Sequence, residues 1–177
     1  MARTSDQKRI RVVAFPTDLG WTAMAWKAGQ VARLTFGHDS AQEAWRKLDY
    51  PELPSSERRQ EQRIIKRLQT YAAGNRDDDF QDVTLDVSHM TAFQQAVTEC
   101  CRRIPIGETR SYGELAEVAG HPGAARAVGR VMATNRFPLI VPCHRVVAAG
   151  GAIGGFSAPN GIAMKQRLLR PELTVEV

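Results

Sequence analysis

The chain of 177 residues contains only three cysteines, Cys100, Cys101 and Cys143. An odd number of cysteines without framework spacing excludes a secreted disulfide scaffold and indicates reduced thiols. Cys100 and Cys101 fall on the apolar face of a predicted helix, so we interpret both as packing residues. No apolar run approaches the roughly 20 residues of a membrane span, and the polar N-terminus lacks the apolar stretch of a signal peptide. We therefore expect a cytoplasmic protein that makes no membrane contact.

Strong charge of one sign is also missing. The chain carries 24 Lys and Arg against 19 Asp and Glu, a formal charge of +5. Residues 1–90 carry a net charge of +1 and residues 91–177 a net charge of +4, with nine arginines and a single lysine in the second half. Arginine favours phosphate through its planar donor fork. On charge alone a solvated basic face explains this excess better than phosphate binding does, so the motifs must decide.

The first half of the chain predicts strands followed by helices, with no internal repeats or low-complexity tracts. Alternating β-rich segments separated by short turns indicate an antiparallel meander. The candidate strands are residues 10–15, 21–26, 30–36 and 83–87, and the candidate helices follow Ser40 and cover residues 57–73, with breaks at Pro51 and Pro54. The last strand is expected to return to the first sheet. We place a domain boundary after residue 88, giving units 1–88 and 89–177.

The second half is helical and well punctuated. Two capping boxes, each a Ser or Thr followed three residues later by Glu or Gln, predict helices that begin after residues 91 and 111. A tight turn at residues 120–123 precedes a third helix over residues 124–134. A short helix, a turn with glycine and a second helix form the helix-turn-helix pattern.

The third predicted helix has an unusual composition. Residues 124–130 are small side chains interrupted by Arg126 and Arg130. Small side chains let a helix approach DNA closely, which suits the shallow minor groove better than base reading in the major groove. A small-residue helix packed tightly inside a core fits the same pattern, and the composition leaves both interpretations open.

A candidate nucleophile follows an apolar segment. Residues 139–142 read as a β-rich stretch ending in proline, after which Cys143 stands beside His144. A thiol reacts as the thiolate, and an adjacent base is the usual means of activating it. Residues 150–161 are glycine-rich and can shape a pocket, but they lack the context of a phosphate-binding loop. Neighbours in sequence need not face each other, so this pair alone leaves a structural role open.

Five parts of the second half stand in a distinctive order and spacing, namely residues 104–112, 124–129, 135, 142–146 and 161–169. Together they closely resemble the O6-alkylguanine-DNA alkyltransferases, also called methylated-DNA–protein-cysteine methyltransferases. The resemblance is dense over residues 91–172 and looser over residues 10–90. No single motif is as specific as this combination.

The resemblance implies an α/β protein of two lobes. The first would be a ribonuclease-H-like antiparallel sheet with helices, and the second a helical, winged-helix-like domain with a helix-turn-helix. It implies DNA repair by irreversible transfer of one alkyl group from guanine O6 to Cys143, by a monomer acting on double-stranded DNA without a cofactor. Some members bind zinc in the first lobe through Cys and His. This lobe has no cysteine and only His38 and His89, so we expect no metal.

The same resemblance assigns catalytic roles. Cys143 would be the alkyl acceptor, His144 would remove its proton through a water, and Glu172 would orient His144. Tyr112 would supply a proton to the departing guanine. Asn135 would brace the tight bend before the active site.

Binding roles also follow from the resemblance. Arg126 would enter the base stack after the damaged nucleotide is flipped out, because an enzyme cannot reach guanine O6 inside a duplex. The further DNA-binding candidates are Tyr112, Ala125, Ala127, Gly129 and Arg130. The candidate walls of the guanine pocket are Pro138, Val146, Phe156 and Ser157.

Three departures from the family pattern are visible. Leu173 follows Glu172 where glycine is common, which leaves the aim of Glu172 open. Phe156 replaces a frequent tyrosine and removes a possible hydroxyl contact. Residues 158–160 fill a loop that is often shorter, which could narrow the pocket.

Other functional classes fit parts of the pattern. A non-catalytic lesion-binding relative would lack the cysteine, whereas Cys143 stands here in an intact Pro-Cys-His-Arg context. A helix-turn-helix regulator would need a reading helix richer in polar side chains. A cysteine hydrolase would also use Cys and His, but no segment resembles one. The range of alkyl groups, and any activity on O4-alkylthymine, stay open.

Overall fold

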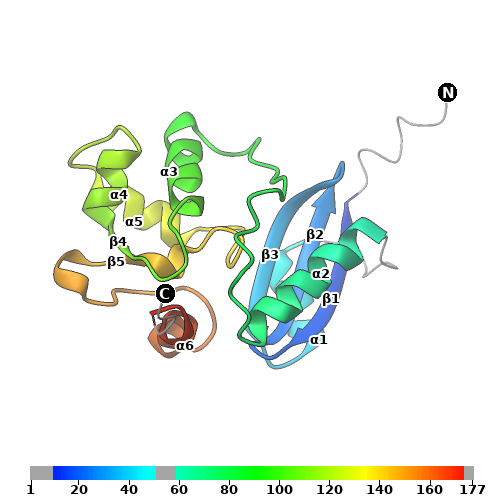
Figure 1. Cartoon of the computed structure of the whole chain (residues 1–177). Helices are drawn as coiled ribbons and strands as arrows, with labels where there is room; N and C mark the ends of the chain where they lie inside the picture. The colour runs from blue at the N-terminus through cyan, green and yellow to red at the C-terminus, as the bar shows by residue number, and fades with distance from the viewer. Residues whose placement is uncertain (1–9, 51–58, 174–177) are drawn as a thin grey trace. The chain divides into compact units, whose positions relative to one another are not determined.

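Residues 10–50 and 59–173 are described in the computed structural model, which divides into two units, residues 1–86 and 87–177 (Figure 1). The breaks predicted at Pro51 and Pro54, and the first two residues of the helix predicted from residue 57, lie outside the described residues. No described helix has the length and apolar character needed to cross a lipid bilayer.

A three-stranded antiparallel meander forms the first unit's sheet, as predicted. Its strands are β1 (Arg11–Thr17), β2 (Gly20–Lys27) and β3 (Gln30–His38), in that spatial order. β1 runs two residues further than the expected end at residue 15 and includes Pro16. Proline is tolerated there because β1 is an edge strand, where a missing N–H leaves no ladder bond unmade.

Helix α1 (Ala41–Leu48) covers one face of this sheet. The predicted cap is confirmed: the Ser40 hydroxyl accepts a hydrogen bond from the backbone N–H of Glu43 at 3.2 Å. Successive side chains of a strand point to opposite faces, and the helix buries Ala44 and Leu48 against one of them. The buried cluster on that face is Val12, Ala23, Ala25, Ala32, Ala44 and Leu48.

Helix α2 (Arg59–Ala72) lies along β1 (Figure 1). Arg11 Nε donates to Glu61 Oε1 at 2.8 Å, and the Gln69 side chain donates to the Pro16 carbonyl at 3.0 Å. Its predicted apolar face is confirmed as buried. The residues of that face are Ile64, Ile65, Leu68 and Tyr71.

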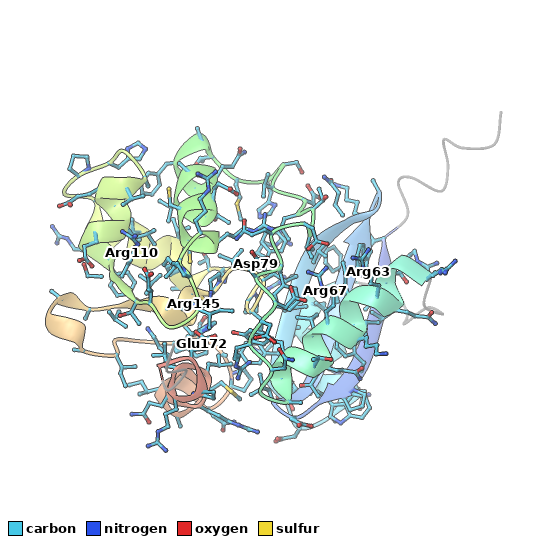
Figure 2. The ribbon with its side chains drawn as sticks, viewed as in Figure 1. Arg63, Arg67, Asp79, Arg110, Arg145 and Glu172 are labelled. Carbon is cyan, nitrogen blue, oxygen red and sulfur yellow. The ribbon has the colours of Figure 1, made fainter. Side chains whose placement is uncertain are left out.

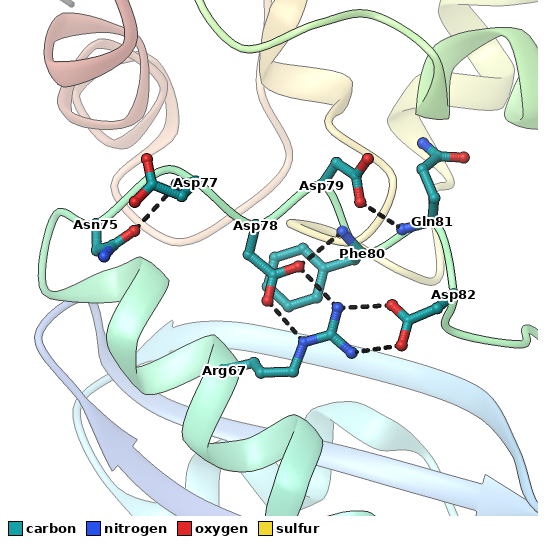
Figure 3. Close-up of polar contacts among 8 residues, drawn as sticks. All are labelled: Arg67, Asn75, Asp77, Asp78, Asp79, Phe80, Gln81 and Asp82. Atoms are coloured by element: carbon teal, nitrogen blue, oxygen red, sulfur yellow. Dashed lines mark hydrogen bonds and ion pairs between the residues drawn. The ribbon is translucent and has the colours of Figure 1, made fainter.

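The loop after α2 is closed by one arginine (Figure 3). Arg67 donates from Nε to Asp78 at 2.6 Å and from Nη2 to Asp82 Oδ1 at 2.6 Å. Between these carboxylates Phe80 adopts a left-handed backbone with φ +52° and is 1% exposed. Its ring centroid lies 5.1 Å from the Arg67 guanidinium and 5.6 Å from the ring centroid of Tyr71. The loop is therefore held by ionic and aromatic contacts to α2.

The strand predicted at residues 83–87 is reduced to a single parallel bridge between Leu85 and Val31 of β3. Val31 donates to the Thr84 carbonyl at 2.9 Å, and the Asp86 N–H donates to the Val31 carbonyl at 2.8 Å. The segment does return to the first sheet, as expected. It cannot extend as a strand because the chain enters a turn at Ser88.

The second unit is built mainly from helices. Both predicted capping boxes are confirmed, with Thr91 and Ser111 accepting from the backbone three residues later. A short parallel pair, β4 with β5, joins Arg110 to Val146. The elements are α3 (Ala92–Arg102), β4 (Arg110–Ser111), α4 (Tyr112–Val118), α5 (Ala125–Ala133), the 3-10 helices η2 (Cys143–Arg145) and η3 (Ala149–Gly151), β5 (Val146–Val147) and α6 (Gly161–Leu173).

Two sequence predictions are wrong in this unit. Residues 139–142 form a tight bend rather than a β-segment, with Leu139 at φ +73° and a bridge between Pro138 and Val141. Proline usually ends a helix, so the sequence predicts a C-terminal helix from Ile162 that stops at Pro171, but α6 continues to Leu173 and Glu172 is helical. Proline removes one N–H from the last turn, and side-chain hydrogen bonds to Glu172, described below, hold that turn in place.

Candidate active site around Cys143

Cys143 lines a cavity of about 320 Å³ in the second unit. The walls come from the start of α4, from α5, from η2 and from the loop before α6. The lining residues are Tyr112, Gly129, Met132, Ala133, Cys143, Gly155, Phe156 and Ser157. Of the walls expected from the sequence, Phe156 and Ser157 lie there. The other two, Pro138 and Val146, are not among the described residues that line it: Pro138 belongs to the bend, and Val146 is fully buried in β5.

Asn135 fixes the bend that leads to Cys143. Its side-chain amide donates to the Val141 carbonyl at 3.0 Å, and its carbonyl oxygen accepts from the Phe137 N–H at 2.9 Å. The Cys143 N–H in turn donates to the same Val141 carbonyl at 2.8 Å. Asn135 therefore connects the end of α5 to the cysteine and holds a backbone turn that includes a residue at positive φ.

The Cys143 side chain is a thiol at neutral pH. Burial raises its pKa above the ordinary value of 9.0, and the hydrogen bond with Asn135 and the positive charge of Lys165 offset only part of the rise. Ionising the thiol in this buried site costs free energy, because burial disfavours the charged thiolate. A reaction at this sulfur therefore needs a group that takes the proton as the sulfur attacks.

His144, Glu172 and Arg145 form a buried polar cluster beside the cysteine. His144 Nε2 lies 3.2 Å from Glu172 Oε1, and the side chains of both residues are 1% exposed. Burial acts to raise the pKa of Glu172, but hydrogen bonds from His144 and Arg145 outweigh it and hold the pKa far below the ordinary value of 4.5. The lowered pKa keeps the carboxylate ionised at neutral pH, and an ionised carboxylate can only accept hydrogen bonds. The question raised by Leu173 is answered: Glu172 points at His144.

Lys165 of α6 is fully buried behind the cavity. Its Nζ donates to the Val146 carbonyl at 2.6 Å and lies 3.4 Å from the Gly155 carbonyl. Burial lowers the pKa of Lys165, while the electrostatic influence of Cys143 acts to raise it. The lysine thus joins the strand after the cysteine to the pocket loop and places a positive charge near the sulfur.

Tyr112 opens α4 and forms one wall of the cavity. Two glycines lie against its ring: a Cβ on Gly154 would lie 3.5 Å from the phenol oxygen, and a Cβ on Gly129 would lie 3.9 Å from the ring, both ordinary van der Waals distances. Burial, followed by the proximity of Cys143, raises the pKa of Tyr112 above 10.0. The phenol keeps its proton at neutral pH and is suited to donate it.

Helix α5 presents two faces. Val128 and Met132 are buried, whereas Arg126 and Arg130, one turn apart, are exposed. Ala125, Ala127 and Gly129 are half-buried, and Gly129 borders the cavity. The helix is thus neither wholly in the core nor wholly solvated: its end borders the cavity, and its two arginines face solvent. Among the described residues, no cluster of three or more His, Cys, Asp or Glu side chains is placed to hold a metal.

Comparisons with known proteins place this geometry in a family. A family model described as 6-O-methylguanine DNA methyltransferase, DNA binding domain, matches residues 92–174. The methylated-DNA–protein-cysteine methyltransferase of Mycobacterium tuberculosis is 46% identical over 108 residues, which are 61% of this chain and 62% of that relative. The crystal structure of the Mycobacterium tuberculosis O6-methylguanine methyltransferase matches with a TM-score of 0.76 at 32% identity, covering 96% of both chains. The chain belongs to the O6-methylguanine-DNA methyltransferase family.

Both units of the chain are covered by family structures. A further crystal structure, of Mycobacterium tuberculosis OGT in complex with DNA, matches with a TM-score of 0.74 at 34% identity over 93% of each chain. The predicted fold class, an antiparallel sheet with helices followed by a helical DNA-binding domain, is therefore confirmed. The sequence match to the curated methyltransferase spans less than two thirds of that relative's length.

Some residues around the family's site were missed by sequence reasoning. Lys165 sits three and four residues before Leu168 and Leu169, on the buried face of α6. A lone charge on an apolar helix face was a signal that could have found it. Met132 and Ala133 carry no chemical signal of this kind. Arg145 was noted only as part of a motif, and its buried contacts appear only in the structure.

Proposed function

We propose that this protein repairs DNA by moving one alkyl group from O6 of a guanine in double-stranded DNA to Cys143. The observation that carries the proposal is a buried cysteine on the wall of a 320 Å³ cavity beside an ion-paired histidine. Family relatives named methylated-DNA–protein-cysteine methyltransferases support it. A thioether forms in the reaction and does not revert, so each molecule acts once. No cofactor is needed, because substrate and protein supply every atom.

The nucleophile is generated by His144. Its Nε2 is engaged with Glu172, so the thiol proton must go to Nδ1, through a water as the family resemblance implies. The sulfur then bonds to the alkyl carbon while the carbon–O6 bond breaks, and the electron pair leaves on the guanine. Glu172 stabilises the imidazolium that forms, as in other nucleophile–base–acid relays.

The departing guanine carries negative charge and needs a proton. Tyr112 lines the same cavity as Cys143 and retains its phenol proton at neutral pH, so it is the donor. The phenolate regains a proton from the His144 imidazolium through solvent. The products are an S-alkyl cysteine and an unmodified guanine. In net terms, the hydrogen of the thiol has been transferred to the guanine, and His144 and Tyr112 return to their starting protonation states.

Access to O6 requires that the nucleotide leave the duplex. The small side chains of α5 allow close approach to the minor groove, and Arg126, exposed on that helix, fills the vacated position in the base stack. Arg130, one turn further, contacts phosphate. Action as a monomer is what the family resemblance implies. The curated relative is bacterial, so we place the activity on DNA in the cytoplasm.

Intact mass measurement tests this function. The protein is incubated with duplex DNA containing O6-methylguanine, and with the same duplex unmodified. We expect a mass increase equal to replacement of one hydrogen by a methyl group, only with the damaged duplex. Cys100→Ser is the matched control, because this thiol is partly exposed and lies outside the cavity; it should react normally. Tight binding of the lesion without a mass increase would instead indicate a lesion-binding protein.

A further inference from the structure

Arg145 is a buried charge that the proposed transfer does not use. Its side chain is 4% exposed and grips Glu172 with two parallel hydrogen bonds, Nε to Oε2 at 2.8 Å and Nη2 to Oε1 at 3.0 Å. Figure 2 shows the two side chains together in the second unit. Forked pairing of this kind fixes both the position and the orientation of a carboxylate. Arg145, which follows His144 directly in the chain, therefore fixes the position of Glu172, the carboxylate that pairs with His144.

The guanidinium is itself anchored. Its remaining Nη1 donates to the Ile104 carbonyl at 2.8 Å, just after the end of α3. Oε1 of Glu172 accepts from both Arg145 and His144. The carboxylate of α6 is therefore held by two side chains of η2, and its Oε1 is shared by the arginine and the imidazole.

We propose that Arg145 is a positioning residue that keeps Glu172 ionised and thereby determines which nitrogen of His144 carries the proton. The proposal rests on the transfer function described above. An ionised carboxylate only accepts hydrogen bonds, so the imidazole proton stays on Nε2 and Nδ1 can take the proton of the thiol. A neutral Glu172 would donate its O–H to Nε2. The ring proton would then sit on Nδ1 and block proton uptake from Cys143.

The surroundings of Glu172 show why an arginine is needed. The hydrogen bonds that lower the pKa of Glu172 come from His144 and Arg145, both in η2, and they outweigh the effect of burial. Of these two side chains, arginine is the one that stays positively charged at any pH near neutrality. A buried carboxylate without its cation reverts to the neutral acid. With Arg145 present, the ionised side chains of Arg145 and Glu172 form a pair with no net charge. The thiolate and the imidazolium then form beside this ion pair.

The pH dependence of transfer tests this role. Single-turnover rates are measured on duplex O6-methylguanine DNA for wild type, Arg145→Met and Arg145→Lys. Arg103→Met is the matched control, since Arg103 pairs with Glu99 at 3.0 Å but is 71% exposed. We expect Arg145→Met to be about tenfold or more slower near pH 6 and to recover as the pH rises and Glu172 ionises again. Arg145→Lys should recover at lower pH than Arg145→Met. A loss of equal size at every pH, in folded protein, would show a merely structural role.

A second readout does not depend on transfer, and its decisive result comes from the wild-type protein. Nitrogen NMR of selectively labelled histidine reports which ring nitrogen of His144 is protonated. In the wild-type protein near pH 7 we expect the proton on Nε2, and in a folded Arg145 variant at pH 6 a shift toward Nδ1. A proton on Nδ1 in the wild-type protein would overturn the proposal. If wild type transfers no alkyl group but shows the Nε2 proton, the proposed function fails while the positioning role stands.

Discussion

In each of the two units, one arginine binds carboxylates through paired hydrogen bonds, and the consequences differ. In the first unit Arg67 binds Asp78 and Asp82, whose side chains are 27% and 58% exposed. In the second unit Arg145 binds Glu172, and both side chains are almost fully buried. Water competes for the hydrogen bonds of the first cluster and is excluded from the second. Each hydrogen bond of the second cluster is therefore electrostatically stronger. The more exposed cluster closes a loop, whereas the buried one holds Glu172 against His144 and, as we propose, keeps that carboxylate ionised.

The largest difference between the two regions should appear on removal of the nucleophile. Cys143→Ser should abolish alkyl transfer, because a hydroxyl is a far poorer nucleophile than an activated thiol at neutral pH. Binding to lesion DNA should persist. Arg67→Met, which alters only the exposed cluster, should transfer at the wild-type rate. Single-turnover assays on duplex O6-methylguanine DNA check both, and substantial transfer by Cys143→Ser would remove Cys143 from its role.

Arg126 separates base flipping from simple attraction to DNA. Arg126→Ala and Arg126→Lys should both slow transfer from duplex DNA by about ten- to hundredfold, since flipping costs a few kcal/mol and lysine lacks the planar group that fits between bases. Transfer from free O6-benzylguanine should be nearly unchanged.

The salt dependence of these rates provides the control for Arg126. A phosphate contact would be restored by lysine, and added salt would erase the difference between the two variants. Arg126→Lys acting normally on duplex DNA would rule out the stacking role. Binding of all three proteins to undamaged duplex should stay weak and salt-sensitive.

Lys165 tests whether a buried charge that is not part of the relay also matters. Lys165→Met removes the positive charge that lowers the pKa of the Cys143 thiol, so the thiol becomes harder to ionise. We expect roughly tenfold slower transfer near pH 7, with partial recovery as the pH rises. Lys66→Met changes an exposed lysine of α2 and is the matched control. Equal rates for Lys165→Met and wild type at all pH values would limit Lys165 to packing.

The smallest effect belongs to the exposed cluster. Arg67→Met should lower the free energy of unfolding by about 1 kcal/mol at neutral pH. Arg67 lowers the pKa values of Asp78 and Asp82 below their ordinary 3.8. Their contribution is therefore complete above that pH and is lost as the pH falls through the lowered values. Denaturant titrations should show the wild-type advantage at pH 7 and a shrinking difference below about pH 3.8. A difference independent of pH would exclude the ionic origin.

The fold and the site were predictable from the sequence to different degrees. Local rules placed the meander, the cap at Ser40 and both capping boxes, because these depend on nearby residues. The same rules predicted a β-segment at residues 139–142, where the structure has a bend. The side chain of Asn135 holds this apolar stretch in a turn through hydrogen bonds that the local pattern does not indicate. Glu172 was named from family resemblance, but its aim depends on contacts 27 and 28 residues away in the chain.

Buried charges were the hardest features to foresee. Arg145 looks like one more basic residue of a basic half, and only the tertiary contact with Glu172 reveals its role. Lys165 stands on an apolar helix face, a visible signal whose meaning requires the positions of the Val146 and Gly155 carbonyls. Periodicity predicts which side chains are buried, but it does not predict which partners they meet.

The central claim, irreversible alkyl transfer to one buried cysteine, is tested most directly by the stoichiometry and position of the modification. The protein is saturated with O6-methylguanine duplex DNA, digested and mapped by peptide mass spectrometry. We predict one methyl group per protein molecule, on the peptide that contains Cys143, and no further repair after longer incubation. Methylation of Cys100 or Cys101 instead, or repair of more than one lesion per molecule, would contradict this account.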